Sequence, residues 1–121
     1  MRRPSLQLAI EINKRIRGTD EWFDEPDDLD RVESALRSVE DLDDPVEAAG
    51  LIVYRVTRAQ GFAEGNKRTA LLLARWVLDN NQLDGRQFID PDDRNLADLL
   101  VQAALGRDVE LQVLRFFQRR A

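Results

Sequence analysis

The chain contains no cysteine and no histidine, and lysine is rare, with Lys14 and Lys67 alone among 18 basic residues. Without cysteine there are no disulfides or thiolate metal sites, and nothing points to secretion. Without histidine no imidazole can act as a general base. No apolar run approaches the roughly 20 residues of a membrane span, and no signal-type apolar core follows residues 1–4. We therefore expect a cytoplasmic protein without a membrane segment.

Size and charge narrow the class further. The chain has 121 residues, of which 43% are hydrophobic and 34% are charged. These values are typical of a folded globular protein with one core, so we expect a single domain over residues 1–121. The formal net charge is −5, which argues against general binding of nucleic acid.

Helical periodicity runs through nearly the whole chain. Apolar residues recur at helical spacing in residues 5–17, 29–39, 46–58, 66–80, 93–105 and 108–119. The segment 66–80 is apolar around most of its circumference, which predicts a central helix. Residues 87–89 are expected to be a short extended piece. These elements predict an all-α fold, a compact six-helix orthogonal bundle.

The chemically richest stretch is 60–69, between the third and fourth expected helices. Asn66 is a favourable N-cap for the helix that follows. A helix N-terminus offers unpaired N–H groups to an anion, so Gly65 to Arg68 could form a phosphate site to which Lys67 and Arg68 add charge. Glu64 could hold Mg²⁺, which needs one or two protein carboxylates. The alternative is a capped helix with two exposed basic residues, although cations there oppose the helix dipole.

The same stretch resembles the signature of the Fic/Doc (Fido) family, H-x-F-x-[DE]-[GA]-N-[GK]-R. Six positions match with the correct spacing: Phe62, Glu64, Gly65, Asn66, Lys67 and Arg68. Gln60 stands where the signature has histidine. Lys67 is similar to the Doc branch, and residues 95–101 and 103–106 resemble the closing helices of Doc-type toxins.

The resemblance implies a toxin-type transferase that moves a phosphate, or alternatively a nucleotidyl group, from ATP to a hydroxyl of a host protein such as a translation factor. It further implies that Gly65, Asn66, Lys67 and Arg68 hold the phosphates and that Glu64 places Mg²⁺. Trp22 and Phe23 are implied to contact the target; the alternative is that they fold back on the core. The inhibitory pattern [ST]-x-x-x-E-[GN] of many Fic proteins is absent. An inhibitor would therefore come from a second chain, an antitoxin, and we expect it to bind an exposed groove near the first helix.

Gln60 changes the activity expected from this resemblance. An amide can orient a hydroxyl but cannot accept its proton, and loss of a general base removes about two to four powers of ten in rate. We therefore expect phosphate binding to survive and transfer to be severely impaired. Three explanations stay open: a natural pseudoenzyme, an introduced inactivating substitution, or a variant that uses phosphate or Glu64 as base. Two other functions also stay open, a non-catalytic nucleotide-binding or interaction module and a plain helical adaptor.

Overall fold

The computed structural model describes residues 1–18, 27–90 and 92–121, and every regular element within them is a helix. There are seven helices in these ranges: α1 (Leu6–Arg17), α2 (Leu29–Arg37), α3 (Pro45–Ala59), α4 (Asn66–Asp79), α5 (Gly85–Phe88), α6 (Arg94–Ala104) and α7 (Glu110–Gln118). The predicted all-α class is confirmed. None of the helices in the described residues is long and apolar enough to cross a membrane.

Short polar side chains set the starts of α1 and α3. The Ser5 hydroxyl accepts from the backbone N–H of Leu8 at 3.1 Å and begins α1. The Asp44 carboxylate accepts from the N–H of Val46 at 2.9 Å, directly before Pro45 at the first position of α3. Such caps satisfy N–H groups that have no partner inside the helix. They explain why these helix starts were predictable within a residue.

The helix count differs from the six expected because residues 85–88 form the short helix α5. The Asp84 carboxylate accepts from the N–H of Arg86 at 3.0 Å, and the N–H of Ile89 donates to the carbonyl of Gly85 at 3.0 Å. Phe88 is buried at 2% exposure, which holds this turn against the core. Extended backbone was expected over residues 87–89 and is found at Ile89, with φ −118° and ψ 102°.

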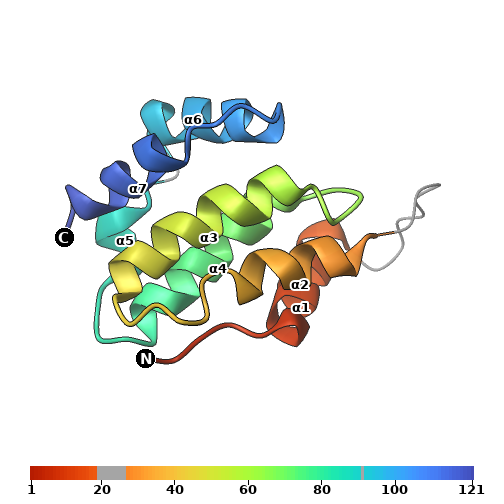
Figure 1. Cartoon of the computed structure of the whole chain (residues 1–121), viewed down its shortest axis with the longest axis horizontal. Coiled ribbons are helices and arrows are strands. Elements are labelled where there is room, and N and C mark those ends of the chain that lie inside the picture. The colour runs from red at the N-terminus through yellow and green to blue at the C-terminus, as the bar shows by residue number, and fades with distance from the viewer. Residues whose placement is uncertain (19–26, 91) are drawn as a thin grey trace.

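Helices α3 and α4 run side by side through the middle of the molecule (Figure 1). One apolar cluster joins them to α5, α6 and α7, and a second joins them to α1 and α2. The central position predicted for α4 is therefore right. The helix is not enclosed on every side, however, because Leu72 on its outer face is 41% exposed. Ten residues of α3 are buried, compared with seven residues of α4, so α3 is the more enclosed helix.

Candidate functional site

The loop that joins α3 to α4, residues 60–65, is here called the connecting loop. It begins at Gln60 with φ 49° and ends at Gly65 with φ 79°, both in the left-handed region. Gly65 adopts this conformation without steric cost, whereas Gln60 pays of the order of 1–3 kcal/mol for it. Phe62 is 3% exposed and belongs to the cluster formed with α1 and α2. The loop is thus anchored in the core at its middle.

Asn66 locks the connecting loop to the first turn of α4. Its Oδ1 accepts from the N–H of Phe62 at 3.0 Å, and its Nδ2 donates to the carbonyl of Phe62 at 2.8 Å. The N-cap position belongs to Gly65, so the prediction that Asn66 caps α4 was wrong. The left-handed turn at Gly65 moves Asn66 into the helix, where its side chain reaches back to the loop.

Asn13 of α1 holds the other side of the loop. It is 2% exposed, and its Nδ2 donates to the carbonyl of Glu64 at 2.8 Å and to the Thr69 hydroxyl at 3.1 Å. A Cβ on Gly65 would lie 3.2 Å from Asn13 Nδ2, so the packing here is close. Asn13 was not among the site residues predicted from the sequence. The available signal was a polar side chain on the apolar face of the first helix.

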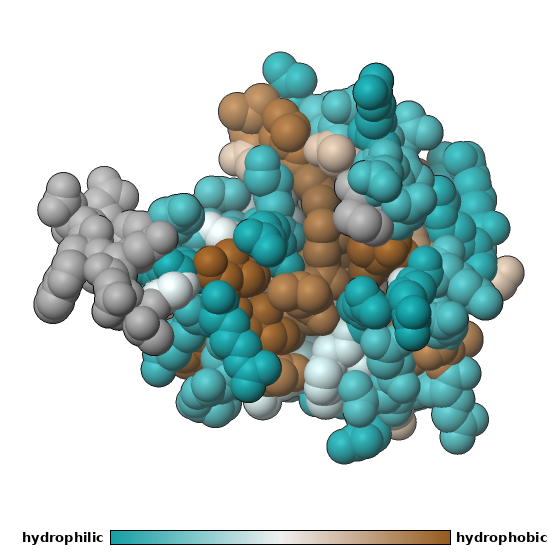
Figure 2. Space-filling view, turned by 180° about the vertical axis from the view of Figure 1, so that it is seen from behind, coloured by the Kyte–Doolittle hydropathy of each residue, from teal (hydrophilic) through white to brown (hydrophobic). Residues whose placement is uncertain are grey.

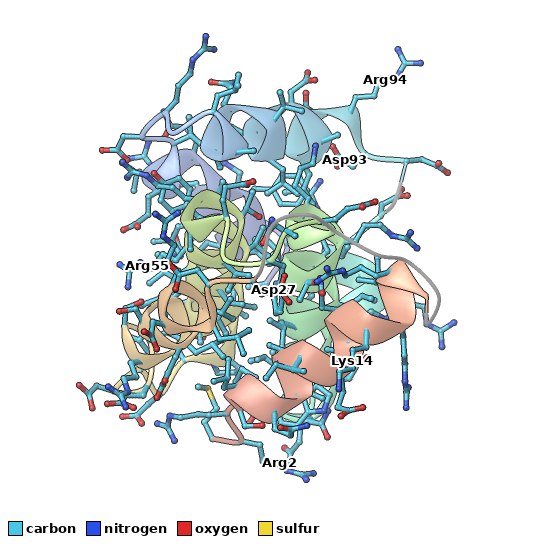
Figure 3. The ribbon with its side chains drawn as sticks, turned by 90° about the vertical axis from the view of Figure 1, so that its right-hand side faces the viewer. Arg2, Lys14, Asp27, Arg55, Asp93 and Arg94 are labelled. Atoms are coloured by element: carbon cyan, nitrogen blue, oxygen red, sulfur yellow. The ribbon has the colours of Figure 1, made fainter. Side chains whose placement is uncertain are left out.

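Residues 27 and 28 hold the loop from a third direction. The Asp27 carboxylate accepts from the N–H of Ala63 at 2.7 Å and pairs with Arg17 of α1 at 2.8 Å. Figure 3 shows Asp27 between α1 and the ends of α3 and α4. The N–H of Asp28 donates to the carbonyl of Gly61 at 2.6 Å. The backbone of the connecting loop is therefore fixed from α1, from α2 and from within.

Gly61 is required by this approach of α2. A Cβ at residue 61 would lie 2.5 Å from Val32 Cγ2 and 2.8 Å from the carbonyl oxygen of Asp28. Both distances are shorter than atoms tolerate, so any larger residue would push the loop away from α2. The glycine therefore sets the position of the loop and not only its backbone angles.

The first turn of α4 gathers positive charge and free donors at one point. The first backbone bond of the helix runs from the N–H of Thr69 to the carbonyl of Gly65 at 2.9 Å, so the preceding N–H groups of the turn have no intrahelical partner. Lys67 and Arg68 are exposed and make no ion pair within the described parts of the chain. The helix dipole adds its positive end to these charges. Such a turn is able to bind an anion.

Glu64 and Gln60 lie at opposite ends of the connecting loop. The Glu64 side chain is exposed and precedes the helix turn, and no group of three metal-binding side chains occurs among the residues that the structure describes. Gln60 Nε2 donates to the carbonyl of Thr57 at 2.6 Å, which turns the amide back onto α3. The structure thus brings Gly65, Asn66, Lys67 and Arg68 together at the start of α4. The Gln60 side chain instead bonds to α3.

Thr57 has an unusual environment beside this position. The residue is 0% exposed, and its hydroxyl is the one buried side-chain polar atom without a hydrogen bond in the described part of the protein. An unsatisfied buried hydroxyl costs free energy.

Trp22 and Phe23, the expected target contacts, lie outside the described residues.

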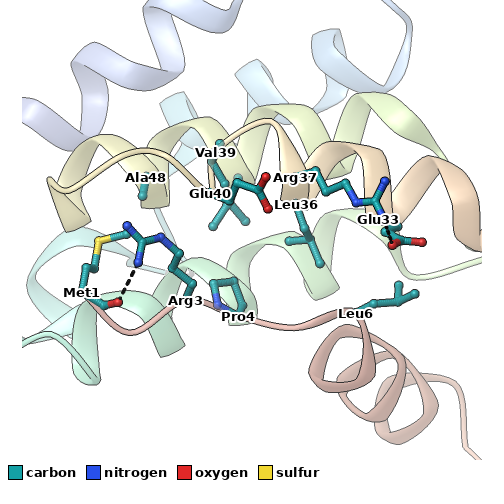
Figure 4. Close-up of a pocket in the computed structure, with 11 residues that line it drawn as sticks. Met1, Arg3, Pro4, Leu6, Glu33, Leu36, Arg37, Val39, Glu40 and Ala48 are labelled. Carbon is teal, nitrogen blue, oxygen red and sulfur yellow. Dashed lines mark hydrogen bonds and ion pairs between the residues drawn. The ribbon is translucent and has the colours of Figure 1, made fainter.

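A cavity of about 280 Å³ lies away from the connecting loop, beneath the N-terminal segment (Figure 4). Met1 and Pro4 cover one side of it, and Leu36 of α2 and Ile52 of α3 form others. The segment is held by Arg3, whose guanidinium donates to the carbonyl of Leu42 at 3.0 Å. None of the predicted site residues lines this cavity, so we locate the candidate site at the loop by its chemistry and not by depth.

Comparison with known proteins agrees with the fold and the loop. The sequence profile of the Fic/DOC family matches residues 6–78, which is more than half of the chain and includes α1 to α4 with the connecting loop. The chain therefore belongs to the Fic/DOC family, whose members are typically enzymes that transfer an AMP or a phosphate group. No curated protein matches the sequence.

Proposed function

We propose that this protein is a Doc-like toxin-type transferase that moves a phosphate from ATP to a hydroxyl of a host protein such as a translation factor, with transfer strongly impaired by Gln60. The observation that carries the proposal is the first turn of α4. There, Lys67 and Arg68 are exposed beside backbone donors, on a loop that Asn13, Asp27 and Asn66 fix in place. A rigid, positively charged turn suits a transferred phosphoryl group, because that reaction depends on positioning and charge stabilisation.

Each residue of the turn has a defined part in this proposal. The N–H groups that follow Gly65 hold phosphate oxygens, and Lys67 and Arg68 neutralise charge on the group being transferred. Asn66 keeps the turn in shape through its two bonds to Phe62. The donor set fits a nucleotide with Mg²⁺, since Glu64 supplies one exposed carboxylate and phosphate oxygens would complete the shell. When bound at Glu64, Mg²⁺ would neutralise phosphate charge.

Gln60 explains the impairment. Its position corresponds to the histidine that serves as base in the family, and an amide takes no proton near neutral pH. Its Nε2 is also bonded to the carbonyl of Thr57 at 2.6 Å, so that donor is already in use. This same observation favours the alternative function, a non-catalytic module that binds a nucleotide or a protein.

Transfer assays with two labels of ATP test the proposal. Extracts are incubated with γ-phosphate-labelled or α-phosphate-labelled ATP and with the unaltered protein, Gln60→His, or Gln60→His combined with Arg68→Gln. We expect one host protein to take the γ label with Gln60→His only, together with growth arrest in cells. Label from the α position would assign nucleotidyl transfer instead. A folded Gln60→His variant that binds ATP but transfers neither label would favour the alternative function, a non-catalytic binding module.

The proposed antitoxin has a suitable groove between α1 and α4. Its apolar walls include Ile12, Ile16, Leu72 and Trp76, and Arg68 also lines it. Apolar surface is gathered along the middle of this face (Figure 2). A second chain that restores growth to cells making Gln60→His should fail to do so when Leu72→Asp is added, because an apolar contact is lost. Continued neutralisation by that chain would place the antitoxin elsewhere.

A further inference from the structure

A cavity of about 290 Å³ lies between α6 and α7, apart from the connecting loop. Its polar lining consists of three arginines and two amide side chains: Arg115, Arg119, Arg120, Asn95 and Gln112. No carboxylate lines it, although the whole chain carries a net charge of −5. The cavity is therefore a local concentration of positive charge on an acidic protein.

Two of these arginines have no compensating charge. Arg115 and Arg119 are separated by four positions at the end of α7, so they lie on the same side of the helix and repel each other. Neither makes an ion pair with any residue in the described ranges. The negative end of the α7 dipole favours cations here and allows them to stay close without a ligand. Their guanidinium groups remain free to bind an anion.

Arg120 is held in a fixed orientation beside them. Its guanidinium carbon lies 3.5 Å from the centre of the Phe116 ring, and its Nη2 donates to the Asp93 carboxylate at 2.8 Å. Its Nη1 donates to the carbonyl of Phe116 at 3.1 Å. Asp93 and Arg94 mark the start of α6 in Figure 3. An arginine fixed in this way loses less conformational entropy when it contacts a ligand.

The remaining lining is apolar. Leu99 of α6 and Phe116 of α7 lie among the polar groups, and Phe116 is 7% exposed. Guanidinium groups match the oxygens of phosphate in pairs, and amides can donate to oxygens that remain. The apolar side chains offer contact to the carbon part of a ligand.

We propose that this cavity binds a small organic phosphate, at a site separate from the connecting loop. A carboxylate has one charge and two oxygens, whereas a phosphate monoester carries nearly two charges and three terminal oxygens. The cavity supplies the two guanidinium groups of Arg115 and Arg119, which have no ion pair in the described ranges, and two amides beside the Arg120 guanidinium that Asp93 already pairs. This is the larger donor set that phosphate can use.

A titration of the folded, isotope-labelled protein by NMR tests this site. Phenyl phosphate is the probe, with inorganic phosphate as the ligand that lacks the ring and benzoate as the ligand that carries a carboxylate in place of the phosphate. We expect shifts of the amides at residues 95, 112, 115 and 119, and tighter binding of phenyl phosphate than of either comparison ligand. Removing two guanidinium contacts in R115Q/R119Q should weaken binding by about tenfold or more. The matched variant R86Q/R107Q, which removes two exposed charges elsewhere, should bind as before.

Three results would overturn the proposal: shifts confined to residues 61–69, unchanged affinity in R115Q/R119Q, or benzoate binding as tight as that of phenyl phosphate. Equal affinities for inorganic phosphate and phenyl phosphate would also contradict the proposal, because they would show that the cavity does not recognise the organic group. If R115Q/R119Q does not fold, Asn95→Asp replaces it, because a carboxylate in the cavity should also weaken binding by about tenfold.

Discussion

Asn13 and Glu64 are 51 positions apart in the sequence, yet the Asn13 side chain donates to the Glu64 backbone carbonyl at 2.8 Å. The bond is partly buried, because Asn13 is 2% exposed whereas Glu64 is an exposed residue. It joins the first helix of the chain to the residue just before the turn that we propose as the phosphate site. The Asn13 amide in α1 is therefore one of the supports that set the position of that turn, together with Asp27, Asp28 and Asn66.

Asn13→Ala should lower the free energy of unfolding by about 1–3 kcal/mol, because it leaves the Thr69 hydroxyl and the Glu64 carbonyl without their donor. Urea unfolding measures this loss, and amide exchange at residues 61–66 should speed up. Gln7→Ala, which removes an exposed side-chain bond on the same helix, is the control and should change stability by less than about 0.5 kcal/mol. Equal effects of the two variants would contradict the role of Asn13.

Two buried threonines should respond to valine in opposite directions. Thr57 and Thr69 are both 0% exposed, but only the Thr69 hydroxyl has a partner. Thr57→Val removes an unsatisfied hydroxyl and should stabilise the protein by about 1 kcal/mol. Thr69→Val removes an acceptor of Asn13 and should destabilise it by about 1–2 kcal/mol. Thermal or urea unfolding of the pair gives the sign, and a loss of stability in Thr57→Val would refute the first expectation.

Gly61→Ala and Gly106→Ala separate steric clash from backbone strain. At residue 61 the new Cβ would lie 2.5 Å from Val32 Cγ2, which should cost about 1–3 kcal/mol and move the loop. At residue 106 no atom lies within 4 Å, but φ is +82°, so the cost should be about 1 kcal/mol of local strain. Only Gly61→Ala should also weaken ATP binding. Identical binding by both variants would show that the loop tolerates displacement from α2.

Asn66→Asp tests the lock between the loop and α4. An aspartate cannot donate to the Phe62 carbonyl, and Asn66 is 7% exposed, so the change should cost about 1–3 kcal/mol. It also places a negative charge at the proposed phosphate site, so ATP should bind more weakly. Asn95→Asp is the control, since Asn95 is exposed in the first turn of α6, where a carboxylate is neutral or favourable. Stability equal to that of Asn95→Asp would count against the lock.

Local patterns were enough to predict the all-α fold, because helix caps act over short distances in the sequence. Ser5, Asp44 and Asp93 each accept a hydrogen bond from a backbone N–H only two or three residues later. The residues from Gly65 to Arg68 were also predictable as a group, since they are consecutive and a helix follows. Their roles in binding stay predictions.

What local patterns could not predict are contacts made across the chain. Asn66 was expected to cap α4, but its side chain hydrogen-bonds to the backbone N–H and carbonyl of Phe62 in the connecting loop. The part played by Asn13 and Asp27 depends on how α1 and α2 pack against the loop. No spacing rule within residues 60–69 contains that information.

The three supports of the connecting loop also have an order in time. During synthesis α1 and residues 27 and 28 are made before the loop, so the Asn13 Nδ2 lacks both of its acceptors until Glu64 and Thr69 have been added. A nascent chain that stops before residue 60 would carry this polar group on the first helix with no connecting loop to accept its hydrogen bonds. Assembly of the turn at Lys67 and Arg68 therefore waits until the first half of the protein is complete, so a partly made chain lacks the proposed binding turn.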